Sequence, residues 1–450
     1  MSKKILVIGG GPAGYPAALK AATLGAEVTV VEKSAIGGVC LNCGCIPSKS
    51  LLDAAHRFDV VKKIGLLSQE DITQPVPSWQ KIIERRGNVI TKLQGGIAGM
   101  FKAKKVNLIN GTASFVDKNT VSVETEQDVQ TITFDAVIIA TGTEAFIPPP
   151  FNAHKDKIYD NSNIFKMPAL PATITIIGGG VIGCEFACIF NALGVKVNIV
   201  EMLPAILPGT DDASVRTLNT SFAKRGINIM TGKKAVDFKV EGNSKKIIFE
   251  DGGELASDEV LVAVGRAVDA SSLKLENIGV CWDRKGIKVN PKTMEVAPGI
   301  YAAGDINGIH LLAHAATAQG EVAAVNACGE NKEYDDTLIP HAMYTWPEVA
   351  SVGLNSAQAA EAGYKAKVQR AYFMANGRAL TQDSAEGQIQ IVSNEENGVI
   401  LGAQIAGPDA SEMIHIFSVV LHAKMTTAQL KEIVWAHPSL SEIIHEALAK

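Results

Sequence analysis

The sequence predicts an α/β protein that contains two similar strand–helix–strand units and ends in a domain of α+β type. The first observation behind this prediction is a glycine-rich segment that occurs twice, near residues 9 and 178. The second is a change of pattern after about residue 336, where short strands precede helices. The third is length, because a chain of 450 residues exceeds one ordinary core and should form about two to four domains.

Each glycine-rich segment lies inside the same larger pattern. In the first copy the apolar run Ile5–Ile8 leads into the glycines, a helical stretch follows, and a second apolar run, Val28–Val31, ends at Glu32. The second copy runs from Ile174–Ile177 to Glu201 at a constant offset of 169 residues (178 against 9, and 201 against 32). Both copies therefore predict a βαβ unit with a right-handed crossover.

The glycines follow the pattern G-x-G-x-x-G in both copies, at Gly9, Gly11 and Gly14 and again at Gly178, Gly180 and Gly183. In such a turn the first glycine permits a tight bend, the second lets the backbone approach a pyrophosphate, and the third lets helix and strand pack closely. The helix that follows directs N–H groups and a positive dipole at the phosphates. One motif alone could be a plain turn, but strand, helix and acid recur together, which predicts two Rossmann-like dinucleotide sites.

Glu32 and Glu201 stand about 20 residues after the glycine turns, where a carboxylate accepts hydrogen bonds from ribose hydroxyls. At the second site the acid also selects the cofactor, because a carboxylate repels a 2′-phosphate. The residues that follow, Met202–Ala205, include no arginine to bind that phosphate. The second site should therefore prefer NAD over NADP.

Proline, glycine and apolar runs indicate where the domains meet. Pro148–Pro150 reads as a linker, Val260–Val264 as the strand that closes the second unit, and Tyr301–Asp305 as a further apolar run that stops at Gly-Asp. We expect the segments 1–147, 148–267, 268–335 and 336–450. The last should contain strands at Gln388–Val392 and Val399–Ile405 and helices at Met413–His422 and Leu440–Leu448.

Composition excludes several classes of function. A net charge of -5, with 20% charged and 47% hydrophobic residues, provides no basic stripe for nucleic acid and no polybasic membrane anchor. The N-terminal apolar run breaks after four residues, and no stretch approaches the roughly 18 apolar residues of a membrane span. We therefore expect a cytoplasmic protein, or a matrix protein if a transit peptide is missing.

Three of the seven cysteines, Cys40, Cys43 and Cys45, fall within six residues. Buried apolar cysteines would not cluster this way between glycines and Lys49. A zinc site would need a fourth cysteine or histidine and a second paired spacing. We therefore expect redox chemistry and no metal. Cys40 and Cys45 lie about one and a half helical turns apart, close enough for a strained and easily reduced disulfide.

The segment Gly37–Lys49 strongly resembles the active-site segment of the class I pyridine nucleotide-disulfide oxidoreductases, and most closely that of the dihydrolipoamide dehydrogenases. The resemblance covers nearly the whole chain in order. Besides both glycine motifs it includes Ala140–Gly142, Val264–Arg266, Tyr301–Asp305, Leu312–His314, Tyr344–Thr345, Pro347–Ala350, Asn376–Ala379 and His437–Glu442.

This resemblance implies FAD in the first dinucleotide domain, NAD in the second, and a C-terminal domain that forms a homodimer. It implies that Cys45 faces the flavin as the charge-transfer thiol, that Cys40 exchanges with substrate, and that Lys49 and Glu185 form an ion pair beside the flavin. Asp305 would hold the ribityl chain. Further cofactor contacts are implied at Gly38, Gly111, Thr141, Val181, Val236, Gly265 and Ala313.

The sequence departs from the family pattern at three positions. Val39 replaces the usual threonine, Cys43 replaces an apolar residue, and Trp346 stands where histidine is common. Because Cys43 adds a third thiol, the pairings Cys40–Cys43 and Cys43–Cys45 stay open beside Cys40–Cys45.

A dithiol substrate needs a general base, because its thiols are mostly protonated near neutral pH. Among nine histidines, His437 stands out since Pro438 fixes the chain beside it and Glu442 could orient its ring. Ser439–Glu442 also reads as a capping box that opens the last helix, so Glu442 could serve both purposes. The resemblance implies that His437 is the base and reaches the disulfide of the neighbouring subunit.

The implied reaction is oxidation of protein-bound dihydrolipoamide to lipoamide, with reduction of NAD⁺ to NADH through FAD and a Cys40–Cys45 disulfide. A partner would carry the lipoyl group, as the lipoyl-bearing protein of a 2-oxoacid dehydrogenase or glycine-cleavage complex. The alternatives are another NAD(P)H-dependent disulfide reductase and an NADH oxidase or diaphorase. Glu201 argues against an NADP-dependent reductase, and Cys45 argues against an oxidase that works with one cysteine.

Overall fold

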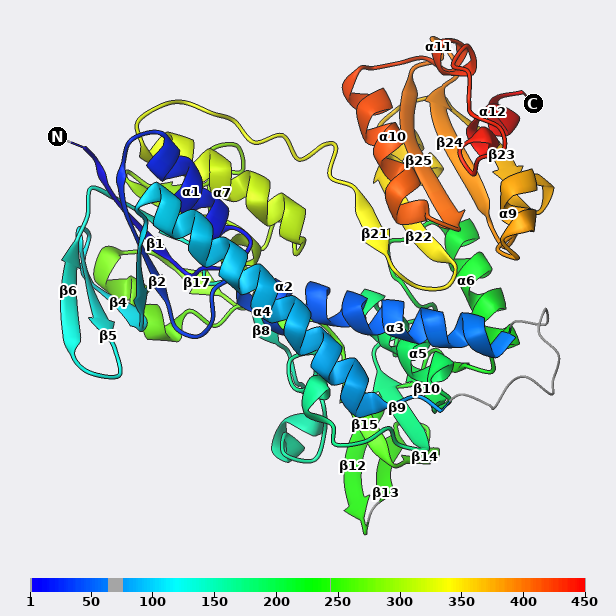
Figure 1. Ribbon diagram of the computed structural model, residues 1–450, viewed down its shortest axis with the longest axis horizontal. Coiled ribbons are helices and arrows are strands. Elements are labelled where there is room, and N and C mark those ends of the chain that lie inside the picture. Colours follow the sequence, from blue (N-terminus) through cyan, green and yellow to red (C-terminus); the bar gives the residue numbers. More distant parts are fainter. Residues whose placement is uncertain (1, 64–75, 243, 450) are drawn as a thin grey trace.

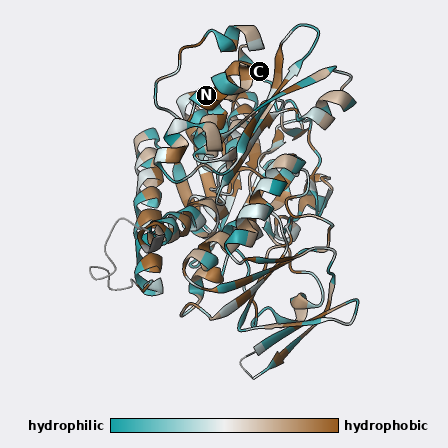
Figure 2. Ribbon diagram, turned by 90° about the vertical axis from the view of Figure 1, so that its right-hand side faces the viewer, coloured by the Kyte–Doolittle hydropathy of each residue, from teal (hydrophilic) through white to brown (hydrophobic). Residues whose placement is uncertain are grey.

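A computed structural model of the protein describes residues 2–63, 76–242 and 244–449. Figure 1 shows three regions, each built around its own sheet, with the C-terminal segment (orange and red) set apart from the first sheet. Figure 2 shows hydrophobic and hydrophilic residues alternating along the helices, as expected where one helix face packs on the interior. None of the helices within the described ranges has the length and apolar character that a bilayer span requires.

The first sheet has six strands and carries the first glycine turn. Its elements are β1 Lys4–Ile8, α1 Gly14–Thr23, β2 Glu27–Glu32, α4 Trp79–Lys104, β3 Asn107–Asn110, β7 Ala136–Ile139, β19 Glu295–Ala297, β20 Ile300–Ala302 and α7 Ala313–Ala327. The strand order is β19-β20-β7-β1-β2-β3, and β1 pairs in parallel with both β2 and β7. β20 adds in parallel to β7, so a strand from the second half of the chain completes this sheet.

The second sheet repeats this arrangement around the second glycine turn. Its elements are β9 Thr173–Ile177, α5 Val181–Ala192, β10 Lys196–Val200, α6 Asp212–Lys224, β11 Asn228–Met230 and β15 Glu259–Val262. The strands are parallel, in the order β11-β10-β9-β15. In both β1 and β9 every residue after the first is buried, which suits a parallel strand covered on both faces. Both predicted βαβ units are confirmed, although β15 ends two residues before the predicted Val264.

The third sheet is antiparallel, in the order β21-β22-β25-β24-β23. Its strands are β21 His341–Met343, β22 Glu348–Gly353, β23 Ala366–Tyr372, β24 Gln388–Asn394 and β25 Ile400–Gly407. Its helices are α8 Ser356–Glu361, α9 Gly377–Thr381, α10 Ala410–His422, α11 Thr427–Lys431 and α12 Glu442–Leu448. The predicted α+β character of this region is confirmed. The final helix begins two residues later than predicted.

Further elements connect and flank these sheets. Antiparallel strands form one ribbon from β4 Thr112–Asp117, β5 Thr120–Glu124 and β6 Val129–Thr133, and another from β12 Ala235–Glu241, β13 Ser244–Phe249 and β14 Glu254–Ser257. A short hairpin joins β17 Trp282–Asp283 to β18 Gly286–Ile287. The helices α2 Gly38–Cys43 and α3 Cys45–Lys63 follow the first βαβ unit, and short 3-10 helices span Phe151–His154, Ile164–Lys166, Ser271–Leu273, Leu275–Ile278, Asp305–Asn307 and Phe373–Ala375.

The chain passes twice between the first and second sheets, and the two passages lie side by side. β8 (Glu144–Ala145) pairs antiparallel with β16 (Arg266–Ala267). These crossings lie next to the expected boundaries at residues 147 and 267. We propose on this basis that the chain divides near 147, 267 and 335, with the first and third segments in one domain.

Candidate active site

Both glycine turns open into one cavity of about 1120 Å³. The cysteine segment lies along the same cavity, so the two nucleotide sites and this segment share one space. Most cofactor-binding residues expected from the sequence line it, namely Gly9, Gly11, Glu32, Gly38, Lys49, Gly111, Thr141, Gly178, Gly180, Val181, Glu185, Glu201, Gly265, Asp305 and Ala313. Three expected residues, Gly14, Gly183 and Val236, are not among the lining residues.

The glycines of the two turns have matching surroundings. Gly9 has a φ of +101°, and a Cβ added there would lie 2.4 Å from the carbonyl oxygen of Ala140. A Cβ on Gly14 would lie 1.8 Å from the Gly9 oxygen, so this third glycine packs helix against strand instead of facing the cavity. Gly183 packs in the same way, 2.0 Å from the oxygen of Gly178.

The second glycine of each turn faces open space. A Cβ on Gly180 would meet nothing within 4 Å, and one on Gly11 would meet only the Cα of Gly38 at 3.7 Å. A side chain at either position would occupy the volume in front of the helix that follows. The turns thus provide the two backbone cradles that a pyrophosphate requires, and the residues present fit a dinucleotide at each site.

Glu32 and Glu201 are buried and hold identical positions in their turns. Glu32 accepts a hydrogen bond from Gly10 N–H at 2.7 Å and another from Ser34 N–H at 2.8 Å. Glu201 accepts from Gly179 N–H at 2.7 Å and from Leu203 N–H at 2.8 Å. An ionised carboxylate has about four acceptor positions, so each acid keeps capacity for ribose hydroxyls.

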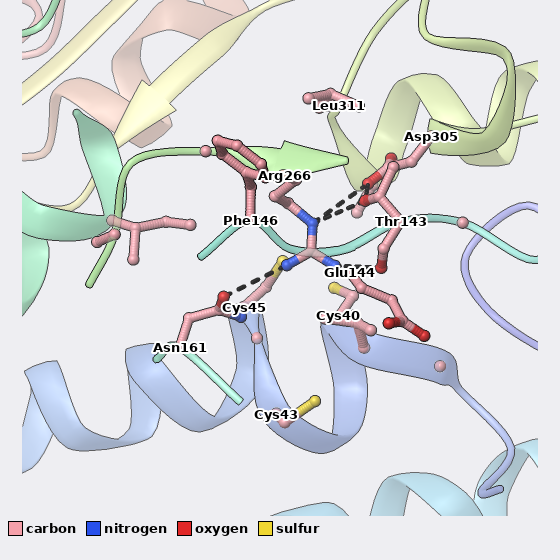
Figure 3. Close-up of a pocket in the computed structure, with 18 of the residues that line it drawn as sticks. Cys40, Cys43, Cys45, Thr143, Glu144, Phe146, Asn161, Arg266, Asp305 and Leu311 are labelled. Carbon is pink, nitrogen blue, oxygen red and sulfur yellow. Dashed lines mark hydrogen bonds and ion pairs between the residues drawn. The ribbon is translucent and has the colours of Figure 1, made fainter. Parts of the chain in front are cut away.

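Cys40 and Cys45 lie on consecutive helices, and the expectation of one continuous helical stretch is wrong. α2 ends before Gly44, and α3 begins directly after it. A Cβ at Gly44 would lie 2.9 Å from the carbonyl oxygen of Val39, so only glycine fits at the break. In Figure 3 the sulfur atoms of Cys40 and Cys45 both point upward from the segment, toward Arg266.

Cys40 and Cys45 interact as a pair, and their pKa values move in opposite directions. The hydrogen bond with Cys40, together with the positive charge of Lys49, outweighs partial desolvation and lowers the pKa of Cys45 to about 7. The hydrogen bond with Cys45, burial and the neighbouring charge raise the pKa of Cys40. In the reduced pair Cys45 is therefore the thiolate and Cys40 the protonated thiol.

Cys43 is directed elsewhere. Figure 3 shows its sulfur on the opposite side of the segment from Cys40 and Cys45. The side chain is partly buried against the core of the second sheet, and burial raises the pKa of its thiol. This placement favours the Cys40–Cys45 pairing over either pairing that includes Cys43.

An ion pair between Lys49 and Glu185 lies on the cavity wall near the cysteines. Lys49 Nζ donates to both carboxylate oxygens of Glu185, at 2.7 and 2.8 Å. Glu185 is buried in α5 and also accepts the backbone N–H of Tyr344 at 3.0 Å. Lys49 in addition lies 4.6 Å from the ring centroid of Tyr344. These contacts join α3 to α5 and to the third sheet, and they fix the cation beside Cys45.

A polar network around Arg266 was not identified from the sequence. Arg266 Nε donates to Thr143 Oγ1 at 2.7 Å, and its guanidinium also reaches Asn161 at 3.4 Å (Figure 3). Thr143 Oγ1 in turn donates to Asp305 Oδ2 at 2.9 Å, and burial raises the pKa of Asp305. The resemblance includes Val264–Arg266, but no local pattern shows that its arginine contacts residues 143, 161 and 305.

Asn42 was also missed, although it organises the cysteine segment. Its amide nitrogen donates to three carbonyl oxygens, of Ala35, Ile36 and Gly38, at 2.9 to 3.2 Å. From α4, Gln94 Nε2 donates to the Asn42 side-chain oxygen at 2.7 Å. One side chain thus ties the turn before α2 to α4. A polar residue between two cysteines gives no sequence signal of this role.

His437 and Glu442 lie on the third region, and neither lines the large cavity. His437 Nδ1 is 2.9 Å from Glu442 Oε1, and the His437 side chain is 80% exposed. Glu442 Oε2 also accepts Ser439 N–H at 2.7 Å, and these two contacts, that of Ser439 first, lower its pKa. The expected capping box is only half formed, because Ser439 Oγ has no hydrogen-bond partner among the described residues.

The described ranges contain no group of three or more His, Cys, Asp and Glu side chains arranged to hold a metal ion.

Two protein-family models together match nearly the whole chain. Residues 3–320 match the pyridine nucleotide-disulphide oxidoreductase family, and residues 339–448 match the dimerisation domain of that family. These matches confirm the predicted fold class of two dinucleotide-binding domains and a dimerisation domain.

Curated relatives match this chain over nearly their whole length. Dihydrolipoyl dehydrogenase from Bacillus subtilis is 38% identical over 450 residues, covering 98% of this chain and 95% of the relative. The enzyme of that name from Thermus scotoductus is also 38% identical, covering 98% of this chain and 96% of the relative.

Two solved structures share the fold. LpdA from Mycobacterium tuberculosis has a TM-score of 0.92 at 27% identity, covering 99% of both chains. The HOCl-induced flavoprotein disulfide reductase RclA from Escherichia coli, solved as a Cu(II) complex, has a TM-score of 0.90 at 26% identity, covering 100% of this chain and 99% of the other. The chain thus belongs to the pyridine nucleotide-disulphide oxidoreductase family, close to the dihydrolipoyl dehydrogenases, and is an FAD- and NAD-dependent disulfide oxidoreductase.

Proposed function

We propose that this protein oxidises dihydrolipoyl groups carried by a partner protein and passes the two electrons to NAD⁺. The observation that carries the proposal is a cysteine pair with opposed pKa shifts, placed in the cavity that both glycine turns line. The substrate class comes from the relatives named dihydrolipoyl dehydrogenase, which are 38% identical. The partner would be the lipoyl-bearing protein of a 2-oxoacid dehydrogenase or glycine-cleavage complex.

The exchange starts from a Cys40–Cys45 disulfide. A substrate thiolate attacks Cys40 Sγ, the bond between the two cysteines breaks, and Cys45 leaves as a thiolate. A thiol with a low pKa leaves faster, which suits Cys45 with its pKa of about 7. The second substrate thiolate then attacks the substrate sulfur joined to Cys40. The substrate closes its own disulfide, and Cys40 is released and takes up a proton, as its raised pKa favours.

His437 is the proposed base that removes the protons of the substrate thiols. Its Nδ1 is bound to Glu442, which leaves Nε2 as the proton acceptor. Because His437 does not line the cavity of its own chain, we assign it to the cysteine pair of the partner subunit. The dimerisation domain in residues 339–448 supports this arrangement. The active site would then be complete only in the dimer.

The second half-reaction carries the two electrons from the reduced cysteine pair to NAD⁺, and residues of the cavity assist it. FAD, when bound, supplies the two-electron acceptor that hands a hydride to NAD⁺. Re-forming the Cys40–Cys45 bond gives up two electrons and the Cys40 proton, so the sum is one dithiol and one NAD⁺ to one disulfide, one NADH and one proton. Lys49, held by Glu185, stabilises the Cys45 thiolate until then.

Steady-state turnover tests this proposal. Purified protein should reduce NAD⁺ rapidly with dihydrolipoamide and should reduce NADP⁺ far more slowly. Glutathione disulfide should be a poor acceptor of electrons from NADH. Faster turnover of glutathione disulfide than of lipoamide would instead favour another disulfide reductase of the same family.

We expect the reduced protein to be alkylated at Cys45 with a pH midpoint near 7, below the range of an ordinary thiol. Lys49 contributes to this lowering, so Lys49→Met should move the midpoint upward. The thiolate fraction then rises only at higher pH. Iodoacetamide labelling across pH, read by peptide mass analysis, measures both midpoints. Lys118→Met, on an exposed turn, is the matched control and should leave the midpoint unchanged. An unchanged midpoint in Lys49→Met would contradict the assigned role of Lys49.

A further inference from the structure

Beside Glu201, the acid of the second glycine turn, the cavity wall is formed by residues that follow it by about 30 positions in the chain. Lys233 and Lys234 line the cavity together with Glu201 and Leu203. Two backbone hydrogen bonds hold them there, since Lys233 N–H donates to Glu201 O at 3.0 Å and Gly232 N–H donates to Leu203 O at 2.9 Å. Two lysines therefore lie at the adenosine end of the NAD site.

Such a pair of cations should weaken the preference for NAD. Lysine is a common ligand of phosphate groups, and a free ammonium beside Glu201 would offset the repulsion between that carboxylate and a 2′-phosphate. Glu201 alone therefore does not account for the selection of NAD over NADP at this site. The selection also depends on whether the two lysine charges are free or neutralised.

Two consecutive acids, Glu250 and Asp251, form ion pairs with these two lysines. The two acids lie in the turn between β13 and β14, on the ribbon that Figure 1 shows below the second sheet. Lys233 Nζ pairs with Asp251, and Lys234 Nζ pairs with Glu250 at 2.8 Å. The backbone supports this register, because Glu250 N–H donates to Lys234 O at 3.0 Å and Asp251 Oδ1 accepts Gly253 N–H at 3.1 Å.

Of the two lysines, Lys233 should have the larger effect on the binding of a 2′-phosphate. Its side chain is 34% exposed, against 56% for Lys234, so water screens its charge less. Its own backbone N–H contacts Glu201, the residue that faces the ribose. Its ion pair is also the first cause of the lowered pKa of Asp251.

We infer that Asp251 is a specificity-determining residue for the pyridine nucleotide. By pairing with Lys233 it withholds that ammonium from a 2′-phosphate, so the phosphate of NADP meets the carboxylate of Glu201 without a compensating cation. Selection of NAD is then shared between Glu201 and a hairpin turn some 50 residues later in the chain. This inference concerns the nucleotide alone and holds whether or not the dithiol substrate is a lipoyl group.

Equilibrium binding of two small nucleotides tests the inference without turnover. Adenosine 5′-monophosphate and adenosine 2′,5′-bisphosphate differ only in the 2′-phosphate, and calorimetry on the intact protein measures both. In Asp251→Asn the affinity for the bisphosphate should rise about 5- to 10-fold, the effect of freeing one nearby charge at a partly exposed site. The affinity for the monophosphate should stay within about twofold. Asp251→Asn should also raise kcat/KM for NADP⁺ relative to NAD⁺.

Two further variants separate this effect from net charge. Asp237→Asn removes the carboxylate that pairs with Lys239 on the same ribbon, outside the cavity lining, and should change neither affinity. Asp251→Asn combined with Lys233→Gln should lose the gain. An unchanged bisphosphate affinity in Asp251→Asn, an equal gain in Asp237→Asn, or a gain that survives loss of Lys233 would each overturn the assignment.

Discussion

Replacing Cys45 with serine should reduce lipoamide-linked turnover by at least about 10³-fold, the scale seen when a covalent catalytic residue is removed. Serine cannot form the disulfide with Cys40, so the electron pair of the substrate has no entry point. The measurement is the rate of NAD⁺ reduction with dihydrolipoamide. The nucleotide cradles are untouched, so NADH oxidation by ferricyanide, which needs no thiol pair, should persist.

Cys281→Ser is the matched control for this variant. Cys281 is exposed and lies outside the cavity lining, so its loss should leave lipoamide turnover at the level of the unmodified protein. Full lipoamide activity in Cys45→Ser would contradict the dithiol mechanism. A loss of ferricyanide activity in parallel would show instead that the variant no longer holds its cofactors.

Replacing His437 with glutamine should slow the reaction with dihydrolipoamide by about 10² to 10⁴-fold, the usual contribution of a general base. Glutamine keeps a polar side chain next to Glu442 but cannot accept the substrate proton. The loss should shrink as pH rises, because more of the substrate is then already thiolate. A pH profile of kcat/KM measures this. His422→Gln, at the exposed end of α10, is the control and should keep the original profile.

Mixed dimers test whether the histidine acts across the interface. A dimer of one Cys45→Ser chain and one His437→Gln chain would retain one site with both wild-type groups if the base comes from the partner subunit. Random assembly of co-expressed chains should then recover about a quarter of the full activity, since half of the dimers are mixed and each has one working site. No recovery above the two single variants would place the base in the same chain as its cysteines.

The sequence predicted the two βαβ units well, because each is formed by residues that are close together in the chain. The two copies of the glycine turn could be aligned residue by residue, and Gly14 and Gly183 do pack helix on strand as their spacing implies. Glu32 and Glu201 likewise hold matching positions. In these units the strand, turn and helix are consecutive, so sequence spacing determines geometry directly.

The parts that could not be predicted depend on contacts between distant segments. The helix breaks at Gly44, where a side chain would lie 2.9 Å from the Val39 carbonyl oxygen. A count of residues per turn does not show this break. Lys233 and Asp251 meet only because a ribbon folds back beside the second sheet. Residues 202–205 alone therefore do not reveal the two charges of this ion pair.

In the proposed mechanism electrons pass through a disulfide between Cys40 and Cys45, and Cys43 takes no part. A disulfide map of the air-oxidised protein, made by alkylating free thiols in denaturant before digestion and mass analysis, tests this most directly. We expect a Cys40–Cys45 link as the main product, with Cys43 recovered in the alkylated form. Recovery of Cys40–Cys43 or Cys43–Cys45 as the main link would contradict it.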